Sequence, residues 1–508
     1  MKNINLLSIL LIVQFSFAQL TKVKTNYSSL PNIIFIYTDD LGYGDLSSYG
    51  ATEISTPNID KLANEGLKFT NGHSSSATCT PSRYALLTGM YPWRKKAKIL
   101  DGDAPMLIDT LQATLPKILQ SKGYHTGIVG KWHLGLGNGR INWNEKINPS
   151  PNEIGFDYSF IMAATQDRVP TVYIKNGYVN NLDKNDPIEV NYNKNFDDQP
   201  TGLNNPELLK MNWSHGHNNT IVNGISRIGF MKGGRSAIWN DELMSNVFLS
   251  EAQNYIRNNK KEPFFLYYAM QQPHVPRTPS LNFVGKSGLG PRGDVILEAD
   301  WCVGELIKTL EQEALLKNTL IIFSSDNGPV LNDGYYDNAI EKLGNHNPSG
   351  LMKGGKYSLF EAGTRIPFIT YWKGKIKPGI SNALVSQVDL LASITSLIGA
   401  QEDNSLDSKN FMETFLGYKK NGRASLIIEA ATKIALRKGN WVLIPPYKGA
   451  QINKNVNIEL GNLNEYQLYN LKSDISQKKN LAKTKTKKLK ELISDLELMK
   501  DNPLAKIK

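Results

Sequence analysis

The fold of this chain is decided by residues 30–44, LPNIIFIYTDDLGYG. Residues 30–37 form an apolar, β-branched run, which is typical of a strand buried in a parallel sheet. Asp39 and Asp40 follow this run directly, so two carboxylates are expected at the carboxyl end of the strand. In open α/β sheets, ligands bind outside the carboxyl ends of the strands. The stretch therefore predicts a parallel sheet with a polar site at one edge.

The same order of strand, polar loop and helix recurs along the chain. Buried strands are expected at residues 126–130, 263–270, 320–324 and 366–371, and helices at residues 57–66, 111–123, 241–258, 295–315 and 389–397. This alternation predicts an α/β fold with a large, mostly parallel sheet flanked by helices. Residues 138–234 are rich in Asn, Asp, Pro and Gly, and we expect them to form a long irregular insertion that faces substrate.

Beyond about residue 400 the pattern changes. Short antiparallel strands are expected at residues 425–430, 432–437, 441–444 and 466–470, followed by a basic amphipathic helix at residues 483–499. We therefore expect a catalytic domain at residues 19–400 and a smaller C-terminal α+β domain at residues 401–508.

Residues 1–18 have the pattern of a secretory signal peptide. Lys2 precedes a short apolar run, and small residues stand before Gln19. A membrane anchor is the alternative, but the run is short for a bilayer span, and no other segment is apolar enough to cross one. We expect export to the periplasm or the medium, with no stable membrane span.

The formal net charge of +11 suits a polyanionic partner. No nucleic-acid motif or basic-aromatic repeat is present, so a sulfated polysaccharide fits an exported protein better than nucleic acid does. The alternative is a generally solvated, lysine-rich surface. The two cysteines, Cys79 and Cys302, are candidates for a disulfide in an exported chain.

Residues 79–89, CTPSRYALLTG, predict a short helix. Thr80 suits the N-cap, Pro81 the first helical position and Gly89 the C-terminal stop, which leaves Cys79 just before the helix N-terminus and Arg83 about one turn inside. An anion could bind at such a helix end. From these residues alone, Cys79 is either a thiolate nucleophile of low pKa or a half-buried structural residue.

The order Cys-x-Pro-Ser-Arg followed by Leu-Thr-Gly resembles the signature of the type I sulfatases, members of the alkaline phosphatase superfamily. In that family this cysteine is oxidised after synthesis to formylglycine. The segment GKWHLG at residues 130–135 is similar to the second sulfatase signature, and the resemblance spans residues 31–400. It implies an alkaline-phosphatase-like fold and a formylglycine-generating or sulfatase-maturating enzyme as a partner. It also leaves Cys302 alone, as a buried packing residue.

Four candidate metal ligands follow two of the predicted strands: Asp39, Asp40, Asp326 and Asn327. Their hard oxygen atoms suit Ca²⁺ or Mg²⁺ and not zinc. Each pair taken alone is also typical of a turn. In sulfatases the matching positions hold a divalent cation, commonly calcium, and residue 79 completes its coordination.

The resemblance also implies roles for five further residues. Arg83 and Lys131 would bind the sulfate, His133 would orient the formylglycine, and His274 and Lys356 would contact the leaving group and the sulfate. A sulfate ester reacts only when its charge is neutralised, which explains the need for cations. The hydrated aldehyde would attack sulfur with Asp326 as base, and its second hydroxyl would then expel sulfate.

Parts of the predicted insertion resemble bacterial carbohydrate sulfatases that remove 6-O-sulfate from galactose or N-acetylgalactosamine. On this resemblance Asp167, Arg168, His215 and His217 are candidate sugar contacts. For His215 and His217 the alternatives are a zinc pair or plain loop residues, and for Asp167 and Arg168 an ion pair that only braces the loop. Other functions also stay open: action on a rhamnose- or uronic-acid-containing polysaccharide, a phosphatase or phosphonate hydrolase of the same superfamily, or a sulfoglycan-binding protein without catalysis.

Overall fold

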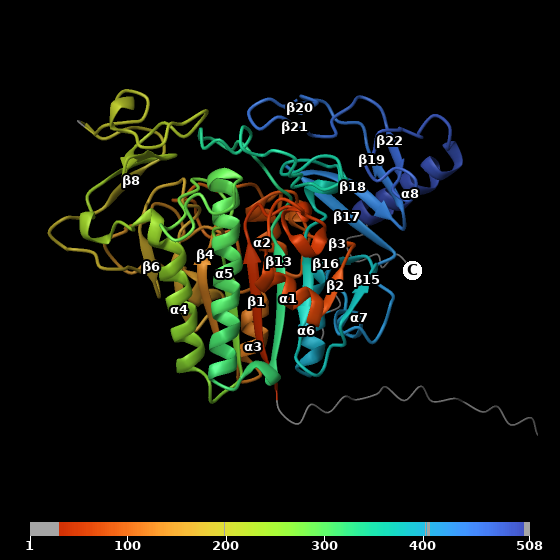
Figure 1. Ribbon diagram of the computed structural model, residues 1–508, viewed down its shortest axis with the longest axis horizontal. Helices are drawn as coiled ribbons and strands as arrows, with labels where there is room; N and C mark the ends of the chain where they lie inside the picture. Colours follow the sequence, from red (N-terminus) through yellow and green to blue (C-terminus); the bar gives the residue numbers. More distant parts are fainter. Residues whose placement is uncertain (1–29, 198, 402, 404–406, 502–508) are drawn as a thin grey trace, which may run out of the picture. The chain divides into compact units, whose positions relative to one another are not determined.

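A mixed sheet of ten strands forms the centre of the computed structural model, which describes residues 30–197, 199–401, 403 and 407–501 (Figure 1). The predicted signal peptide at residues 1–18 lies outside the described residues. The strand order is β15 (Gly379–Ser381), β2 (Leu67–Phe69), β14 (Phe368–Tyr371), β13 (Thr319–Ser325), β1 (Asn32–Thr38), β12 (Phe264–Ala269), β4 (His125–Lys131), β5 (Tyr158–Met162), β6 (Tyr173–Lys175) and β7 (Tyr178–Val179).

The five strands from β13 to β5 are parallel, as the sequence predicts. β1 is buried along its whole length between β13 and β12, with Phe35 opposite both Ile322 and Tyr267. Two antiparallel segments flank this core: β14 pairs with β13 on one side, and β6 pairs with β5 on the other. The carboxyl ends of β1, β13, β12 and β4 therefore meet at one edge of the sheet.

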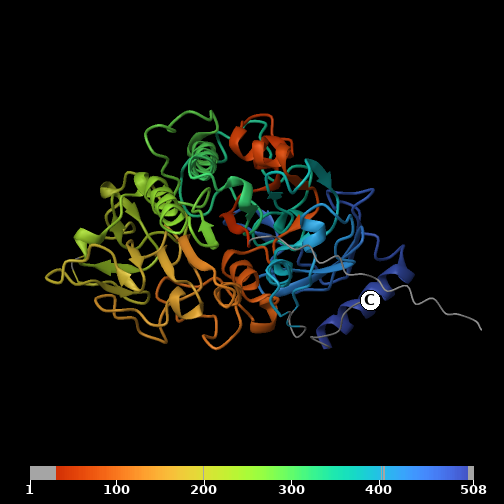
Figure 2. The same ribbon diagram turned by 90° about the horizontal axis from the view of Figure 1, so that it is seen from below.

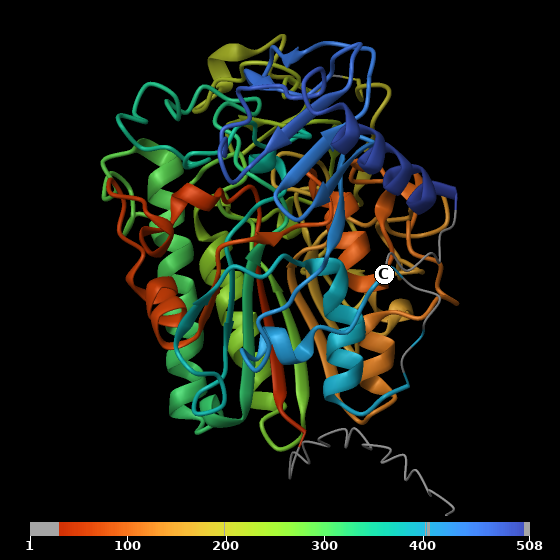
Figure 3. The same cartoon turned by 90° about the vertical axis from the view of Figure 1, so that its right-hand side faces the viewer.

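Helices cover both faces of the sheet (Figures 1 and 3). One face is covered by α1 (Pro57–Glu65), α4 (Met244–Asn258) and α5 (Gly290–Gln312), whose apolar side chains share one core with β1 and β12. The other face carries α2 (Cys79–Thr88), α3 (Leu115–Gln120) and α6 (Leu390–Leu397), which contact one another. No helix among the described residues has the length and apolarity that a bilayer span requires.

The C-terminal region forms an antiparallel sheet in the order β17 (Ser425–Ala430), β18 (Lys433–Lys438), β19 (Trp441–Ile444) and β22 (Gln467–Asn470). Helix α8 (Thr486–Asp501) packs on this sheet through Leu492 and Leu496. Viewed from below, this region and the segment around residue 200 lie on opposite sides of the central sheet (Figure 2). The described residues from Pro31 onward form one compact unit, and the domain boundary at 400/401 stays a prediction.

Three local features differ from what the sequence predicts. Residues 138–234 are not irregular throughout, because β5, β6 and β7 extend the central sheet, and β8 (Glu189–Asn191), β9 (Ile221–Val222), β10 (Ile225–Ser226) and β11 (Phe230–Lys232) form two small antiparallel pairs. Strands of two to five residues are too short to show a periodicity. A hairpin of β20 (Ile452–Asn453) and β21 (Ile458–Glu459) was not predicted either.

The third concerns the start of α2. The helix begins at Cys79 itself, after Thr78, and Thr80 does not cap it. The Thr80 hydroxyl donates instead to the carbonyl oxygen of His133 at 2.9 Å, which ties the helix start to the loop after β4. The predicted stop is confirmed: Gly89 has φ 66°, and its N–H donates to the carbonyl oxygen of Ala85. Cys79 and Cys302 are both buried free cysteines, so the disulfide does not form.

Candidate active site

The predicted metal ligands come together at the carboxyl ends of β1 and β13. Asp39 and Asp40 follow β1, and Asp326 and Asn327 follow the neighbouring β13. The Asp40 N–H donates to Asp326 Oδ1 at 3.2 Å, and Asn327 Nδ2 donates to Asp40 Oδ1 at 2.7 Å. All four side chains are buried. One oxygen each of Asp39 and Asp326 and the sulfur of Cys79 lie within 4.8 Å of one another.

These residues fit a hard divalent cation. Asp39 Oδ1 and Asn327 Oδ1 are buried and accept no hydrogen bond from any described residue. Such unpaired atoms are costly in a folded protein unless a ligand satisfies them. Burial, and then the nearby Asp326, raise the pKa of Asp39 well above its usual range, more than Lys131 lowers it. A cation between these oxygens would pair the buried atoms and offset their negative charge. An all-oxygen ligand set favours calcium or magnesium.

Three cations surround the acidic cluster. Arg83 donates from Nε and Nη2 to Asp326 Oδ2, at 3.1 and 2.8 Å. Lys131, at the end of β4, donates from Nζ to Asp39 Oδ2 at 2.5 Å. Lys356 Nζ lies 2.8 Å from both Asp40 Oδ2 and Asp333 Oδ2. When ionised, the carboxylates of Asp39, Asp40, Asp326 and Asp333 carry four negative charges, and the three cations balance three of them. A divalent cation would turn the remaining net charge of −1 into +1.

Cys79 lies at the base of a cavity, where α2 begins. Burial raises the pKa of the thiol more than Lys131 and Lys356 lower it. The side chain is therefore a thiol at neutral pH. This result counts against the thiolate of low pKa that residues 79–89 alone left open.

The two predicted histidines occupy different environments. His274 donates from Nδ1 to the carbonyl oxygen of Val275 at 2.7 Å, and burial and then Lys356 lower its pKa well below the usual range. Its Nε2 therefore carries no proton, and it lies 3.8 Å from Asp40 Oδ2. His133 is bonded through Nε2 to the carbonyl oxygen of Leu100, and its buried Nδ1 has no partner among the described residues. A role for His133 in orienting residue 79 stays a prediction.

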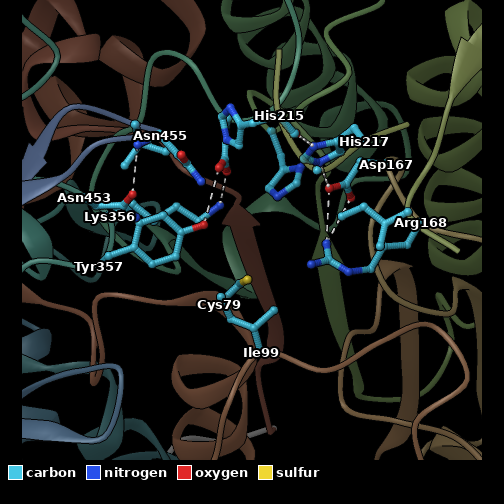
Figure 4. Close-up of a pocket in the computed structure, with 15 residues that line it drawn as sticks. Cys79, Ile99, Asp167, Arg168, His215, His217, Lys356, Tyr357, Asn453 and Asn455 are labelled. Carbon is cyan, nitrogen blue, oxygen red and sulfur yellow. Dashed lines mark hydrogen bonds and ion pairs between the residues drawn. The ribbon is translucent and has the colours of Figure 1, made fainter. Parts of the chain in front are cut away.

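A cavity of about 290 Å³ opens above Cys79. Its lining includes the four predicted sugar contacts, as well as His274 and Lys356 (Figure 4). His217 Nε2 donates to Asp167 Oδ2 at 2.8 Å, and Arg168 Nη1 lies 3.2 Å from both Asp167 carboxylate oxygens. Burial raises the pKa of Asp167, but Arg168 and the hydrogen bond from His217 hold it well below its usual range. Asp167, Arg168 and His217 thus form a charged wall of the cavity.

His215 contributes a hydrogen-bond acceptor to the cavity. The Ser214 hydroxyl donates to Asn332 Oδ1 at 2.8 Å, so it accepts from His215 Nδ1 at 3.0 Å. Burial lowers the pKa of His215. The neutral ring therefore keeps a free lone pair on Nε2. His217 cannot share a zinc ion with it, because both His217 ring nitrogens already bond to oxygen, at His215 O and Asp167 Oδ2.

Four lining residues with polar side chains were missed from the sequence: Asp333, Tyr357, Asn453 and Asn455. Asp333 and Tyr357 stand close in sequence to Asn327 and Lys356, and that proximity was the available signal. Tyr357 also has φ 72°, a conformation that is rare for a bulky residue and often marks a functional site. Nothing in the local sequence connects Asn453 and Asn455 with a site some 370 residues earlier.

Buried oxygen atoms that fit a divalent cation, three cationic side chains and a cysteine at a helix start meet at the carboxyl edge of a mostly parallel sheet, an arrangement suited to the hydrolysis of anionic esters. The Sulfatase family model matches residues 31–400. The chain belongs to the Sulfatase family, and it is a sulfuric ester hydrolase. This finding disfavours the phosphatase and phosphonate hydrolase alternatives.

Individual relatives agree with this assignment. The chain is 50% identical over 478 residues to the N-acetylgalactosamine-6-O-sulfatase of Bacteroides thetaiotaomicron, covering 93% of this chain and 94% of the relative. It is 33% identical to arylsulfatase A of Homo sapiens, covering 81% and 74%. A solved B. thetaiotaomicron structure, described with the metabolism of multiple glycosaminoglycans, superposes with a TM-score of 0.92 at 49% identity, covering 93% of this chain and 100% of that one.

Proposed function

We propose that this sulfatase removes 6-O-sulfate from N-acetylgalactosamine or galactose units at the ends of sulfated polysaccharide fragments. The observation that carries the proposal is the position of the wall formed by Asp167, Arg168 and His217, in the same cavity as Cys79. A carboxylate beside a guanidinium can accept from one ring hydroxyl and donate to the next, so it can distinguish an axial from an equatorial hydroxyl. The 50% identity to an N-acetylgalactosamine-6-O-sulfatase supports the same sugar class.

The catalytic chemistry follows from the residues at the base of the cavity. We propose that Cys79 is oxidised to formylglycine, whose hydrated aldehyde supplies the oxygen nucleophile. Asp39, Asp40, Asp326 and Asn327 would hold a calcium ion, which supplies positive charge that stabilises developing negative charge on the sulfate. Buried oxygen atoms without partners on Asp39 and Asn327 support this assignment.

The surrounding side chains position charge and protons. Arg83 fixes the Asp326 carboxylate through two hydrogen bonds, and Lys131 does the same for Asp39. Lys356 faces the cavity, and Asp333 and Asp40 raise its pKa despite burial, so Nζ stays protonated. Lys356 can therefore stabilise the leaving alcohol oxygen through a charged hydrogen bond, whereas His274, without a proton on Nε2, can only accept a hydrogen bond.

We also propose that the chain is exported to the periplasm or the medium, and that a formylglycine-generating or sulfatase-maturating enzyme acts on Cys79. The signal-like residues 1–18 support export. Mass spectrometry of the peptide that contains position 79 tests the maturation. An aldehyde is expected in active enzyme, and an unmodified thiol in fully active enzyme would contradict the proposal. An unmodified thiol together with no release of sulfate would instead favour a non-catalytic sulfoglycan-binding protein.

Release of sulfate from a panel of defined saccharides tests the proposed substrate. We expect turnover of N-acetylgalactosamine-6-O-sulfate or galactose-6-O-sulfate, and little turnover of 2-O-sulfated uronic acid or sulfated rhamnose. Asp167→Ala and Arg168→Ala should lower kcat/KM on the preferred sugar about 10- to 100-fold, the loss expected for a hydrogen bond to a charged group. An aryl sulfate has no ring hydroxyls, so its turnover should fall far less.

Arg235→Ala is the matched control, because Arg235 directly follows the same insertion but is largely exposed. It should leave both substrates unaffected. Equal losses of sugar and aryl sulfate turnover in the Asp167 and Arg168 variants would show that the pair only braces the loop. Strong activity confined to a uronic-acid or rhamnose sulfate would refute the sugar assignment and leave the sulfatase assignment standing.

A further inference from the structure

The hairpin of β20 and β21 brings two asparagines from the C-terminal region to the mouth of the active-site cavity. Asn453, Asn455 and Val456 line the cavity. Figure 4 shows Asn453 and Asn455 on the side of Lys356 and Tyr357, across the cavity from Asp167 and Arg168. The hairpin is therefore a second wall, opposite the charged one.

The hairpin is fixed against the segment that carries Lys356. The Ser358 hydroxyl donates to the carbonyl oxygen of Glu459 at 2.5 Å, and the Leu359 N–H donates to the carbonyl oxygen of Leu460 at 3.1 Å. Lys353 and Glu459 form an ion pair at 2.7 Å. The Ile458 side chain also approaches Gly355, where an added Cβ would lie 3.2 Å from Ile458 Cδ1. These contacts hold the asparagines in a constant position relative to the catalytic lysine.

The asparagine side chains have donors and acceptors that make no hydrogen bond to any described residue. Asn453 Oδ1 accepts from the Asn455 N–H at 3.2 Å. No described residue bonds to Asn453 Nδ2 or to the side-chain amide of Asn455. Val456, which follows Asn455 and also lines the cavity, is buried and apolar. Neutral amide donors and acceptors beside an apolar surface suit the hydroxyls and the ring face of an uncharged sugar unit.

The size of the cavity sets what reaches this wall. About 290 Å³ lies at the lower end of the usual range for small-molecule pockets, and it suits a single sulfated sugar. That sugar would be held by the Asp167, Arg168 and His217 wall. A second sugar unit, joined to the first, must extend toward the mouth, where Asn455 is exposed and Asn453 half-buried.

We infer that Asn453 and Asn455 form a subsite for the sugar unit that adjoins the sulfated one, and that they bind it through neutral hydrogen bonds to its hydroxyls. The inference rests on the proposed carbohydrate function and extends it to a second unit. The enzyme would therefore prefer a disaccharide or longer chain to the sulfated monosaccharide.

Kinetics on a matched pair of substrates test the subsite. The substrates are N-acetylgalactosamine-6-O-sulfate and a disaccharide that carries the same sulfated sugar at its non-reducing end. Asn453→Ala and Asn455→Ala should each lower kcat/KM on the disaccharide about 2- to 10-fold, the value of one neutral hydrogen bond. Turnover of the monosaccharide should stay within about twofold of wild type, because its contacts are untouched.

Lys454→Ala is the control on the same hairpin, since Lys454 is exposed and does not line the cavity. It should leave both substrates unchanged. If kcat/KM on the disaccharide fell only in Lys454→Ala, and not in the asparagine variants, the hairpin would recognise charge. Equal losses on both substrates in the asparagine variants, or no loss on the disaccharide, would overturn the subsite.

Thermal unfolding of each variant separates lost folding from lost binding. Failure of the proposed function is visible independently, as absence of wild-type turnover of the sulfated monosaccharide. If the substrate panel identifies a different sulfated sugar, the same kinetics are measured with the monosaccharide and disaccharide of that sugar. The ratio of kcat/KM on the disaccharide to kcat/KM on the monosaccharide then decides, as before.

Discussion

Glu429→Gln should make the free energy of unfolding of this protein less sensitive to a rise in pH from about 5 to about 8. Glu429 lies on β17 with 0% of its surface exposed, and its carbonyl oxygen accepts a hydrogen bond from the Ala77 N–H at 2.7 Å. Burial raises the pKa of its carboxyl group to about 8 from an ordinary value of 4.5, and the peptide groups of Thr432 and Trp93 oppose this only in part. The folded protein therefore holds a neutral acid on the strand that bonds to Ala77, two residues before Cys79.

The magnitude follows from the difference between the folded and unfolded pKa. A raised pKa stabilises the fold fully below about pH 4.5, and this contribution is lost as the pH rises through about 8. At about 1.4 kcal/mol for each unit, the free energy of unfolding should fall by roughly 3 to 4 kcal/mol between pH 5 and pH 8 through this group alone. Glutamine is isosteric with the neutral acid and does not titrate, so the variant should lack this loss.

Urea unfolding of wild type and Glu429→Gln, followed by tryptophan fluorescence at both pH values, measures the effect. The difference in free energy of unfolding between variant and wild type should shift by about 3 kcal/mol in favour of the variant from pH 5 to pH 8. Glu53→Gln, at an exposed glutamate, is the control and should show no shift. A difference for Glu429→Gln that does not change with pH would refute the reasoning.

Three further outcomes are expected. Cys79→Ser should keep the thermal midpoint of wild type and abolish sulfate release, because serine cannot be oxidised by the same route; activity near that of matured enzyme would rule out formylglycine. Chelation should remove activity, and calcium should restore it better than zinc, because the ligand set offers only oxygen, so full activity of metal-stripped enzyme would count against the site. Arg292→Met should lower the free energy of unfolding in urea by about 3 to 5 kcal/mol, because the buried Asp45 carboxylate loses its two 2.7 Å hydrogen bonds from Arg292. A loss below about 1 kcal/mol would contradict this.

Much of the site could be predicted because its signals are local. Asp39 and Asp40 stand directly after an apolar run, and Asp326 and Asn327 after another. Parallel strands place their carboxyl ends at one edge of the sheet, so residues that are nearly 290 positions apart must meet if both runs are strands of one parallel sheet. Residues 79–89 were informative in part: the helix and its stop at Gly89 were predicted correctly, whereas Thr80 does not cap the helix start.

The structure of the insertion and the position of the C-terminal hairpin could not be predicted from local sequence patterns. β5 has only five residues, and its place beside β4 depends on pairing across the sheet and not on periodicity. The tautomers of His215 and His274 depend on which backbone and side-chain groups surround each ring. Asn453 reaches the cavity because Ser358 and Glu459 join two distant segments.

By itself, then, the sequence determined the mostly parallel sheet, the four oxygen-bearing side chains at its edge and the helix that begins near Cys79, because each depends on residues close together in the chain. Only the tertiary structure decided that β1 lies between β13 and β12, which brings Asp40 onto Asp326 and Asn327. It alone also placed Asp167 and Asn453 on opposite walls of one cavity. Contacts of this kind result from packing between elements that have no common local pattern, so no rule that acts over a few residues can anticipate them.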